Sequence, residues 1–179
     1  QVSVRPEING RIAELRVDIG DKVKQGDLLF RLDDQELQIE RSTRVTEIDG
    51  AKLQIDGAQV RLERAQRDYD RNKALFDQNL IAREIFDNAR TEVDSVRNAL
   101  DLARNAQERA VKALRQVEDK LSKTKIQAPF DCTVLTRPVS MGQAVSGAGG
   151  FNSGTEVLTV ANLKEMVVNA HINLVKAVI

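Results

Sequence analysis

The central part of the chain, from about Asp33 to Lys123, carries apolar residues at alternating steps of three and four. This spacing is the heptad seam of a coiled coil. Turn-prone residues interrupt the seam at residues 77–79, which predicts an antiparallel helical hairpin with its tip near 77–82. Each arm would hold roughly 40 residues and extend about 60 Å. The seam positions are Ile48, Ala51, Ile55, Ala58, Leu62, Ala65, Tyr69, Phe76, Phe86, Ala89, Val93, Val96, Leu100, Ala103, Ala110, Leu114, Val117 and Leu121.

The segments on either side of the hairpin alternate apolar and polar residues between glycines, which predicts short strands joined by tight turns. The second segment repeats the residue pattern of the first. Neither half has enough strands to bury a core, so the two are expected to combine into one small β-sandwich. The corresponding stretches are 10–12 with 132–134, 20–23 with 142–145, and 26–32 with 154–160, the last after about six extra residues.

The predicted class is therefore α+β, with the hairpin inserted into a split β-sandwich. The sandwich comprises residues 1–32 and 125–161, and the hairpin comprises residues 33–124. A capping-box pattern, Asp33-x-x-Glu36, marks the change from strand to helix. Pro129 marks the return to extended chain.

Composition removes several functional classes. The chain has 27 acidic and 27 basic residues and a net charge of zero. It therefore has no overall positive charge that would attract nucleic acid or an anionic membrane. The single cysteine, Cys132, excludes an internal disulfide. No apolar run is long enough to cross a bilayer. The chain begins and ends in apparent strand, so we expect a fragment whose export signal or membrane anchor lies outside it.

Candidate catalytic groups are few. One histidine and one cysteine do not make a nucleophile and base pair. His171 lies in a strand-like run, where we expect a structural or exposed histidine and not a catalytic one. Met141 and Met166 are too isolated for a soft copper site. The glycine-rich loop at 142–155 lacks the Gly-Lys-Ser/Thr that a phosphate loop needs. We expect no enzyme activity, no metal and no cofactor.

The first arm also carries a second apolar face. Residues 48–54 and 55–61 nearly repeat one heptad, which places Gly50, Leu53, Gly57 and Val60 away from the seam. Glycine inside a helix costs up to about 1 kcal/mol relative to alanine, so close packing of a neighbouring hairpin, into a tube or funnel, is one explanation. Tolerated surface apolarity is the other. The second arm offers a comparable strip at Ala99, Leu102, Ala106 and Ala113.

The two halves carry the pattern Gly10-x-Ile12-x-x-Leu15-x-Val17-x-x-Gly20-Asp21-x-Val23-x-x-Gly26-Asp27, then Leu32-Asp33, and later Ile126-x-Ala128-Pro129-x-Asp131. This pattern resembles the lipoyl-like half-motifs of periplasmic adaptors of the HlyD family, also called membrane fusion proteins. The resemblance implies a barrel-sandwich hybrid domain, with residues 162–179 starting a β-barrel domain. It implies a homo-oligomer, with a hexamer favoured, that bridges an inner-membrane transporter and an outer-membrane channel from the periplasm. Where the family usually has glycine after Asp131, this chain has Cys132.

The tip resembles the signature through which such adaptors meet TolC-type channels, with Arg71 and Leu75 in place and Ala82 at the serine position. Ile85 replaces the usual acidic residue, so a capping pair is missing and either Asn79 caps the second helix or the tip is less rigid. On the alternative interpretation, Leu75 merely closes the coiled coil and Arg71 is a solvated cation.

The glycine-rich loop resembles the loop that lines the central passage of macrolide-exporter-type adaptors, where Gln143, Phe151 and Asn152 would face the channel. A plain hairpin loop is the alternative. This loop and the altered tip favour an ABC-type transporter partner over a proton-driven RND pump. Two other classes remain, a lipoyl or biotinyl carrier and a coiled-coil scaffold. A carrier displays its lysine on a short link between the halves, whereas here that link is the whole hairpin.

Overall fold

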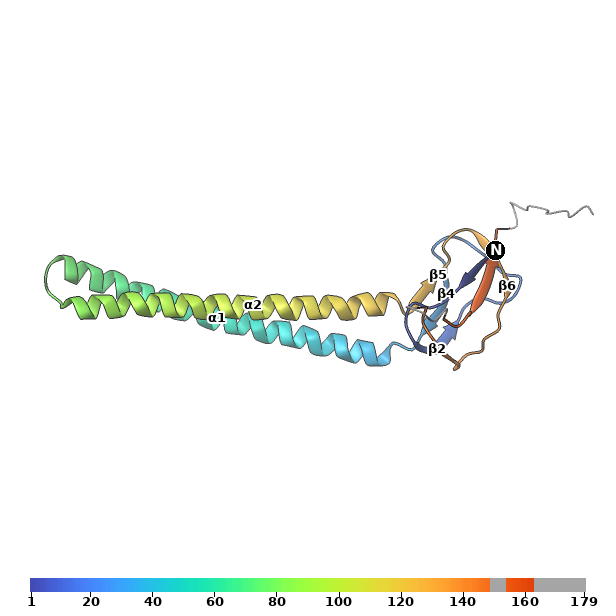
Figure 1. Ribbon diagram of the computed structural model, residues 1–179, viewed down its shortest axis with the longest axis horizontal. Helices are drawn as coiled ribbons and strands as arrows, with labels where there is room; N and C mark the ends of the chain where they lie inside the picture. Colours follow the sequence, from blue (N-terminus) through green and yellow to red (C-terminus); the bar gives the residue numbers. More distant parts are fainter. Residues whose placement is uncertain (149–153, 163–179) are drawn as a thin grey trace, which may run out of the picture. The chain divides into compact units, whose positions relative to one another are not determined.

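The computed structural model describes residues 1–148 and 154–162, and these fall into two units (Figure 1). One unit joins Gln1–Asp34 with the chain from Ser122 onward, and the other is Gln35–Leu121. The first unit is built of antiparallel sheets and the second of two long helices. The predicted α+β class, a β-sandwich split by a helical hairpin, is confirmed. Residues 163–179, expected to begin a β-barrel domain, lie outside the described residues.

The helical unit consists of α1, Gln35–Asp77, and α2, Arg83–Ser122, which run antiparallel (Figure 1). The residues buried on α1 are mostly alanines, whereas those buried on α2 are larger. All seven buried residues belong to the predicted seam. They are Ile48, Ala51, Ala58 and Ala65 on α1, and Val93, Leu100 and Val117 on α2.

Polar contacts add to the seam at the surface of the hairpin. Arg41 and Glu118 form an ion pair between the two helices, with 3.2 Å between Nε and Oε1. Both side chains are about half exposed, where such a pair contributes less than about 1 kcal/mol. The apolar seam therefore holds the arms together. Neither helix in the described part of the chain is apolar enough over a sufficient length to cross a bilayer.

The β unit contains two four-stranded antiparallel sheets, and each sheet takes strands from both halves of the chain. The halves interleave, which is why neither can bury a core alone. One sheet has the order β1-β8-β6-β3 and the other β5-β4-β2-β7. The strands are β1 Val2–Val4, β2 Gly10–Leu15, β3 Lys22–Val23, β4 Leu28–Leu32, β5 Lys125–Gln127, β6 Cys132–Thr136, β7 Ala144–Val145 and β8 Leu158–Ala161.

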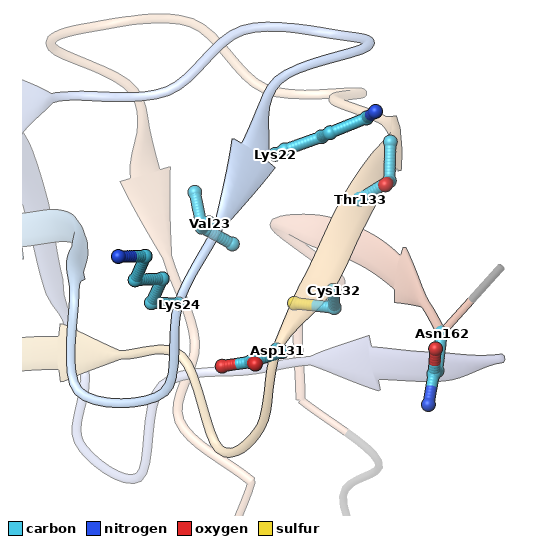
Figure 2. A pocket seen from close by; sticks show the side chains of 7 residues that line it. All are labelled: Lys22, Val23, Lys24, Asp131, Cys132, Thr133 and Asn162. Carbon is cyan, nitrogen blue, oxygen red and sulfur yellow. The ribbon is translucent and has the colours of Figure 1, made fainter. Parts of the chain in front are cut away.

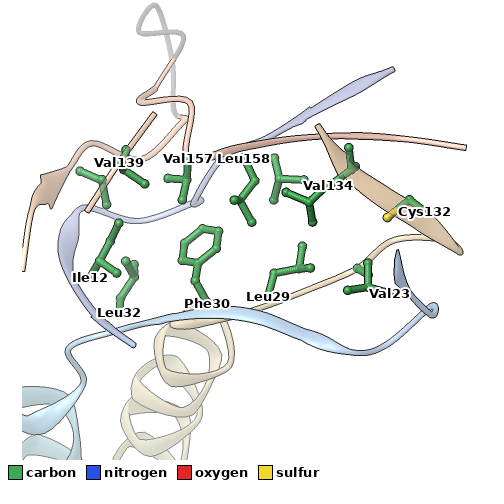
Figure 3. Close-up of a cluster of buried hydrophobic side chains, with 14 residues drawn as sticks. Ile12, Val23, Leu29, Phe30, Leu32, Cys132, Val134, Val139, Val157 and Leu158 are labelled. Carbon is green, nitrogen blue, oxygen red and sulfur yellow. The ribbon is translucent and has the colours of Figure 1, made fainter. Parts of the chain in front are cut away.

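The core lies between the two sheets (Figure 3). Leu29 and Phe30 are adjacent in β4, yet both are fully buried. A register shift between Leu28 and Phe30, where β4 pairs with β5, breaks the usual alternation and turns both side chains inward. They pack with Ile12, Leu32, Val134, Val157, Leu158 and Val160.

Three tight turns in the β unit share one construction, which reflects the internal repeat. The third residue of each is a glycine with positive φ, as a type II turn requires, and the side chain of the fourth accepts a hydrogen bond from the backbone N–H of the first. The glycines are Gly20 (φ 93°), Gly26 (89°) and Gly142 (79°). The side-chain bonds are Asp18 N to Asp21 Oδ2 (2.8 Å), Lys24 N to Asp27 Oδ2 (2.8 Å) and Ser140 N to Gln143 Oε1 (3.0 Å).

Candidate functional site

The hairpin tip is the first candidate site, and its backbone is well capped on the α1 side. Asn79 takes a left-handed conformation with φ 59°. Its N–H donates to the carbonyl of Phe76 (2.8 Å), and the N–H of Leu80 donates to the carbonyl of Leu75 (2.9 Å). These two bonds form a Schellman motif, which ends α1. The expectation that Asn79 caps the second helix is therefore wrong, because it caps the first.

The start of α2 has no side-chain cap. Ala82 stands immediately before Arg83, the first helical residue, and the N–H of Ile85 reaches only the carbonyl of Ala82 (3.1 Å). A methyl group accepts no hydrogen bond, so the first amides of α2 face solvent. An N-cap replaced by alanine typically costs about 1 kcal/mol. The missing capping pair is thus not replaced by another side chain in the tip.

The structure brings Arg71, Leu75 and Ala82 to the same end of the hairpin. Arg71 is exposed, and its Nη2 lies 2.6 Å from Oδ1 of Asp68, one turn earlier on α1. Leu75 is half-buried. The arginine positive charge is therefore already paired within its own helix, while Ala82 is open to solvent.

An aromatic cluster joins the two arms near the tip. The rings of Phe76 and Phe86 stack with centroids 5.0 Å apart, and Tyr69 lies 5.6 Å from Phe86 at a tilt. Such pairs contribute about 0.5–1.5 kcal/mol beyond their buried area. All three residues are in the predicted seam, but spacing alone does not show that they stack. The cluster holds the ends of the arms together where the α2 cap is missing.

Two large apolar side chains at the tip remain exposed, and the sequence pattern did not single out this pair. Leu80 is 64% exposed and Ile85 49% exposed. In a Schellman motif the residue at the position of Leu80 commonly packs on the preceding helix, but here most of its surface faces solvent. The signal in the sequence is a leucine in the connection between the helices and an isoleucine in the first turn of α2, where the family usually has an acidic residue.

The second candidate site is the outer face of α1. Leu53 is 72% exposed and Val60 63% exposed. A Cβ added at Gly50 or Gly57 would meet no atom within 4 Å. Packing within the hairpin therefore does not require glycine at these two positions.

The third candidate site is the loop after β7, which is anchored on both sides. The N–H of Gly147 donates to Oδ1 of Asn9 (2.8 Å), and the N–H of Ala148 donates to the carbonyl of Pro6 (2.8 Å). The N–H of Thr155 donates to the carbonyl of Ser146 (2.9 Å). Gln143 lies in the turn before the loop, with its amide oxygen bound to Ser140. Phe151 and Asn152 lie outside the described residues.

A cavity of about 490 Å³ opens beside β3 and β6 (Figure 2). Cys132 starts β6 and is buried. Burial and the neighbouring Asp131 carboxylate both raise the pKa of its thiol, which keeps it protonated and unreactive near neutral pH. Its strand backbone does not need the glycine usual in the family. The cavity is lined by Lys22, Val23, Lys24, Asp131, Cys132, Thr133 and Asn162.

The described residues offer binding surfaces and no metal-binding cluster. Among residues 1–148 and 154–162, no group of three or more His, Cys, Asp or Glu side chains is placed to hold a metal ion. The other ionised groups with shifted pKa values lie at the surface. For example, a backbone hydrogen bond from Ile19, and the Arg137 guanidinium, lower the pKa of Asp18.

Comparison with known proteins agrees with this architecture. The family model described as RND MFP, barrel-sandwich hybrid domain, matches residues 1–153. No curated protein sequence matches the chain. The structure of MacA from Actinobacillus actinomycetemcomitans is similar, with a TM-score of 0.84 and 26% identity over 91% of this chain and 49% of that one. The chain therefore spans about half the length of that protein.

Two further solved structures are similar over most of this chain. The periplasmic adaptor protein EmrA has 18% identity and a TM-score of 0.48, covering 90% of this chain and 71% of that one. A MacA-MexA chimera carrying the Pseudomonas aeruginosa MexA α-hairpin domain has 25% identity and a TM-score of 0.43, covering 90% of this chain and 47% of that one. Of these three structures, that of MacA supports the fold, as does the family model.

Proposed function

This chain belongs to the membrane fusion proteins, the periplasmic adaptors of efflux systems, and from that premise we propose that it links an inner-membrane transporter to a TolC-like outer-membrane channel for drug efflux or secretion. Adaptors of this family are not enzymes. The observation that carries the proposal is the long helical hairpin inserted into the β-sandwich, where a carrier domain would have a short link. We place the adaptor in the periplasm, anchored to the inner membrane through a segment outside this chain.

The domain assignment follows from this role. Residues 1–32 and 125–161 are proposed as the lipoyl-like domain, 33–124 as the hairpin, and 162–179 as the start of a β-barrel domain. The glycine-rich loop and the altered tip favour a transporter partner of the ABC type. An adaptor of an RND pump is the second candidate, and the description of the matching family model favours it.

We further propose that the tip, through Arg71, Leu75 and Ala82, docks on the outer-membrane channel. The three residues lie at one end of the hairpin, and the channel would displace Asp68 from Arg71. A photoreactive amino acid placed at Leu75 in the full-length protein, in its native host, should crosslink to an outer-membrane channel identified by mass spectrometry. Absence of that product, with the protein exported and folded, would refute tip docking.

Side-by-side packing of hairpins is the proposed basis of assembly, with a hexamer favoured. Leu53 and Val60 are exposed on α1, and Gly50 and Gly57 leave open space on the same helix. A neighbouring hairpin would cover this face. On α2, Leu102 is likewise 68% exposed. Burying such side chains is favourable by about 25 cal/mol per Å² of apolar surface, and the glycines permit close approach of the partner helix.

The charge distribution supports the same arrangement. Residues 35–56 of α1 include five acidic and three basic residues, whereas residues 103–122 of α2 include three acidic and five basic residues. Toward the tip the signs reverse, with five basic and four acidic residues over 57–77 against three basic and five acidic over 83–102. Opposite charges would meet along the whole contact if α1 of one copy lay beside α2 of the next and the two hairpins pointed the same way. The same complementarity acts within each hairpin.

Sedimentation of the full-length protein tests this packing. We expect Gly50→Gln combined with Gly57→Gln to reduce the oligomer to smaller species, because the longer side chains prevent close approach of the helices. Asp56→Gln, an exposed substitution next to Gly57, is the control and should leave the oligomer unchanged. If the double glycine variant sediments like the unmodified protein, lateral packing through this face is refuted.

The glycine-rich segment 142–155, which includes the turn at Gln143 and the loop after β7, is proposed to line the central passage of the ring through Gln143, Phe151 and Asn152. The anchoring of Gly147 and Ala148 on residues 6–9 supports a fixed position for the base of the loop. The amide oxygen of Gln143 is occupied by Ser140, so its NH2 group is the part available to a passing solute. Cysteine placed at Phe151 or Asn152 should react with a small polar thiol reagent more slowly while export substrate is present.

A further inference from the structure

We propose that the tip contacts its partner mainly through an apolar pair, Leu80 and Ile85, flanked by two carboxylates, Asp77 and Glu84. The partner surface that fits this tip patch is an apolar groove bordered by basic side chains. The inference rests on the proposed function, in which that partner is the outer-membrane channel. It goes beyond the tip signature because none of these four residues belongs to the set of Arg71, Leu75 and Ala82.

Exposure of the apolar pair is the first argument. Leu80 and Ile85 are 64% and 49% exposed at the end of a well-capped hairpin. The capping bond of Leu80 comes from its backbone N–H, which donates to Leu75. The leucine side chain is therefore not needed to form the hydrogen bonds that end α1. Two large apolar groups held on an ordered backbone are suited to enter a pocket on another protein.

Charge is the second argument, and it indicates the chemistry of the partner. The tip arginines are already neutralised within their helices, Arg71 by Asp68 at 2.6 Å and Arg83 by Asp87 at 3.5 Å. Within the described residues, Asp77 and Glu84 form no ion pair within 4.0 Å. Lys73, one turn before Asp77, is not within that distance either.

The two carboxylates lie on either side of the apolar pair in sequence, three residues before Leu80 and one before Ile85. Basic groups on the rim of the partner groove would form ion pairs with these two carboxylates when the tip docks. Because such rim contacts are screened by salt, the charge part of the interaction should weaken as ionic strength rises, whereas the apolar part should persist.

The test measures how much outer-membrane channel is recovered with the full-length protein from native membranes after mild crosslinking. We expect Leu80→Asn and Ile85→Asn each to lower recovery about tenfold or more, as for apolar residues at the centre of an interface. Ile39→Asn is the matched control, since Ile39 is 63% exposed but lies about 60 Å away along α1. It should leave channel recovery unchanged.

A charge-reversed variant tests the second part. Asp77→Lys combined with Glu84→Lys should lower recovery at low salt and reverse its salt dependence, because like charges then face each other and salt screens their repulsion. If the Leu80 and Ile85 variants recover the channel normally while Arg71→Ala or Leu75→Ala does not, this inference is overturned and the proposed tip docking stands. If the unmodified protein recovers no channel, both are overturned. Circular dichroism at the helix bands verifies that each variant keeps its hairpin.

Discussion

Several single residues in this protein have structural roles that their sequence context only partly indicates. Gln143 was expected to face a passage, yet its amide oxygen holds the turn at Ser140 just as Asp21 and Asp27 hold theirs. In the internal repeat, Gln143 corresponds to Asp21, so the shared role could have been predicted from the sequence. Periodicity alone does not show it, because a side chain that caps a turn and one that faces solvent both lie outside the apolar pattern.

Gly147 offers a test at the residue scale. A Cβ on this residue would lie 2.6 Å from the carbonyl oxygen of Glu7, and a backbone neighbour moves only at a cost. Gly147→Ala should lower the free energy of unfolding of the β unit by about 1–3 kcal/mol. Hydrogen exchange of the strand amides under mild urea measures it.

Gly50→Ala is the matched control, because its added Cβ meets open space and alanine favours the helix by up to about 1 kcal/mol. It should slow exchange in α1 and leave the strands unchanged. Equal strand exchange in Gly147→Ala and the unmodified protein would contradict the assigned close approach to Glu7.

Glu156 gives the β unit a dependence on pH. The Thr159 hydroxyl donates to this carboxylate at 2.5 Å, and that bond, with a further one from Ser3, lowers the pKa of Glu156. A carboxyl whose pKa is lower in the folded state stabilises the fold above its unfolded pKa of about 4.3, and loses that contribution as pH falls further. Chemical denaturation between pH 7 and pH 3 should show stability falling below about pH 4.3, and less steeply in Glu156→Gln. An identical pH profile for that variant would exclude the role.

At the scale of elements, the sequence predicts the helices and the split sandwich more fully than it predicts their ends. The seam from Ile48 to Leu121 identifies the arms because burial repeats with the helical period. The bulge that buries both Leu29 and Phe30 was not predicted, since it depends on pairing with β5, about 95 residues later in the chain. The α1 cap at Asn79 was missed for a similar reason. Asparagine suits either helix end, and only backbone geometry distinguishes the two.

The tip cap can be tested directly with two substitutions at one position. Asn79 has φ 59°, a conformation that costs a β-branched residue about 1–2 kcal/mol and costs glycine almost nothing. Asn79→Val should therefore destabilise the hairpin by about that amount, while Asn79→Gly should leave it equal or slightly more stable. Thermal unfolding followed by helical circular dichroism measures both. Equal destabilisation by the two variants would show that the asparagine side chain, and not its backbone conformation, matters.

At the scale of the whole molecule, the proposed function is that the full-length protein links an inner-membrane transporter to an outer-membrane channel. The parts that would do so are of different kinds. The β-sandwich has a dense apolar core made from both halves of the chain. The hairpin has a continuous seam, exposed apolar groups on its outer face and at its tip, and no catalytic constellation in the residues described. The core, the seam and the exposed apolar groups support the proposed role as an adaptor.

Sequential affinity purification tests that claim most directly. The outer-membrane channel is tagged and purified after mild crosslinking of native cells, and the inner-membrane transporter is then measured in the purified material. The account predicts that channel and transporter are recovered together when the full-length protein is present and separately when its gene is deleted. Recovery of the two together at the same level without the protein, or their failure to associate in its presence, would contradict the bridging role.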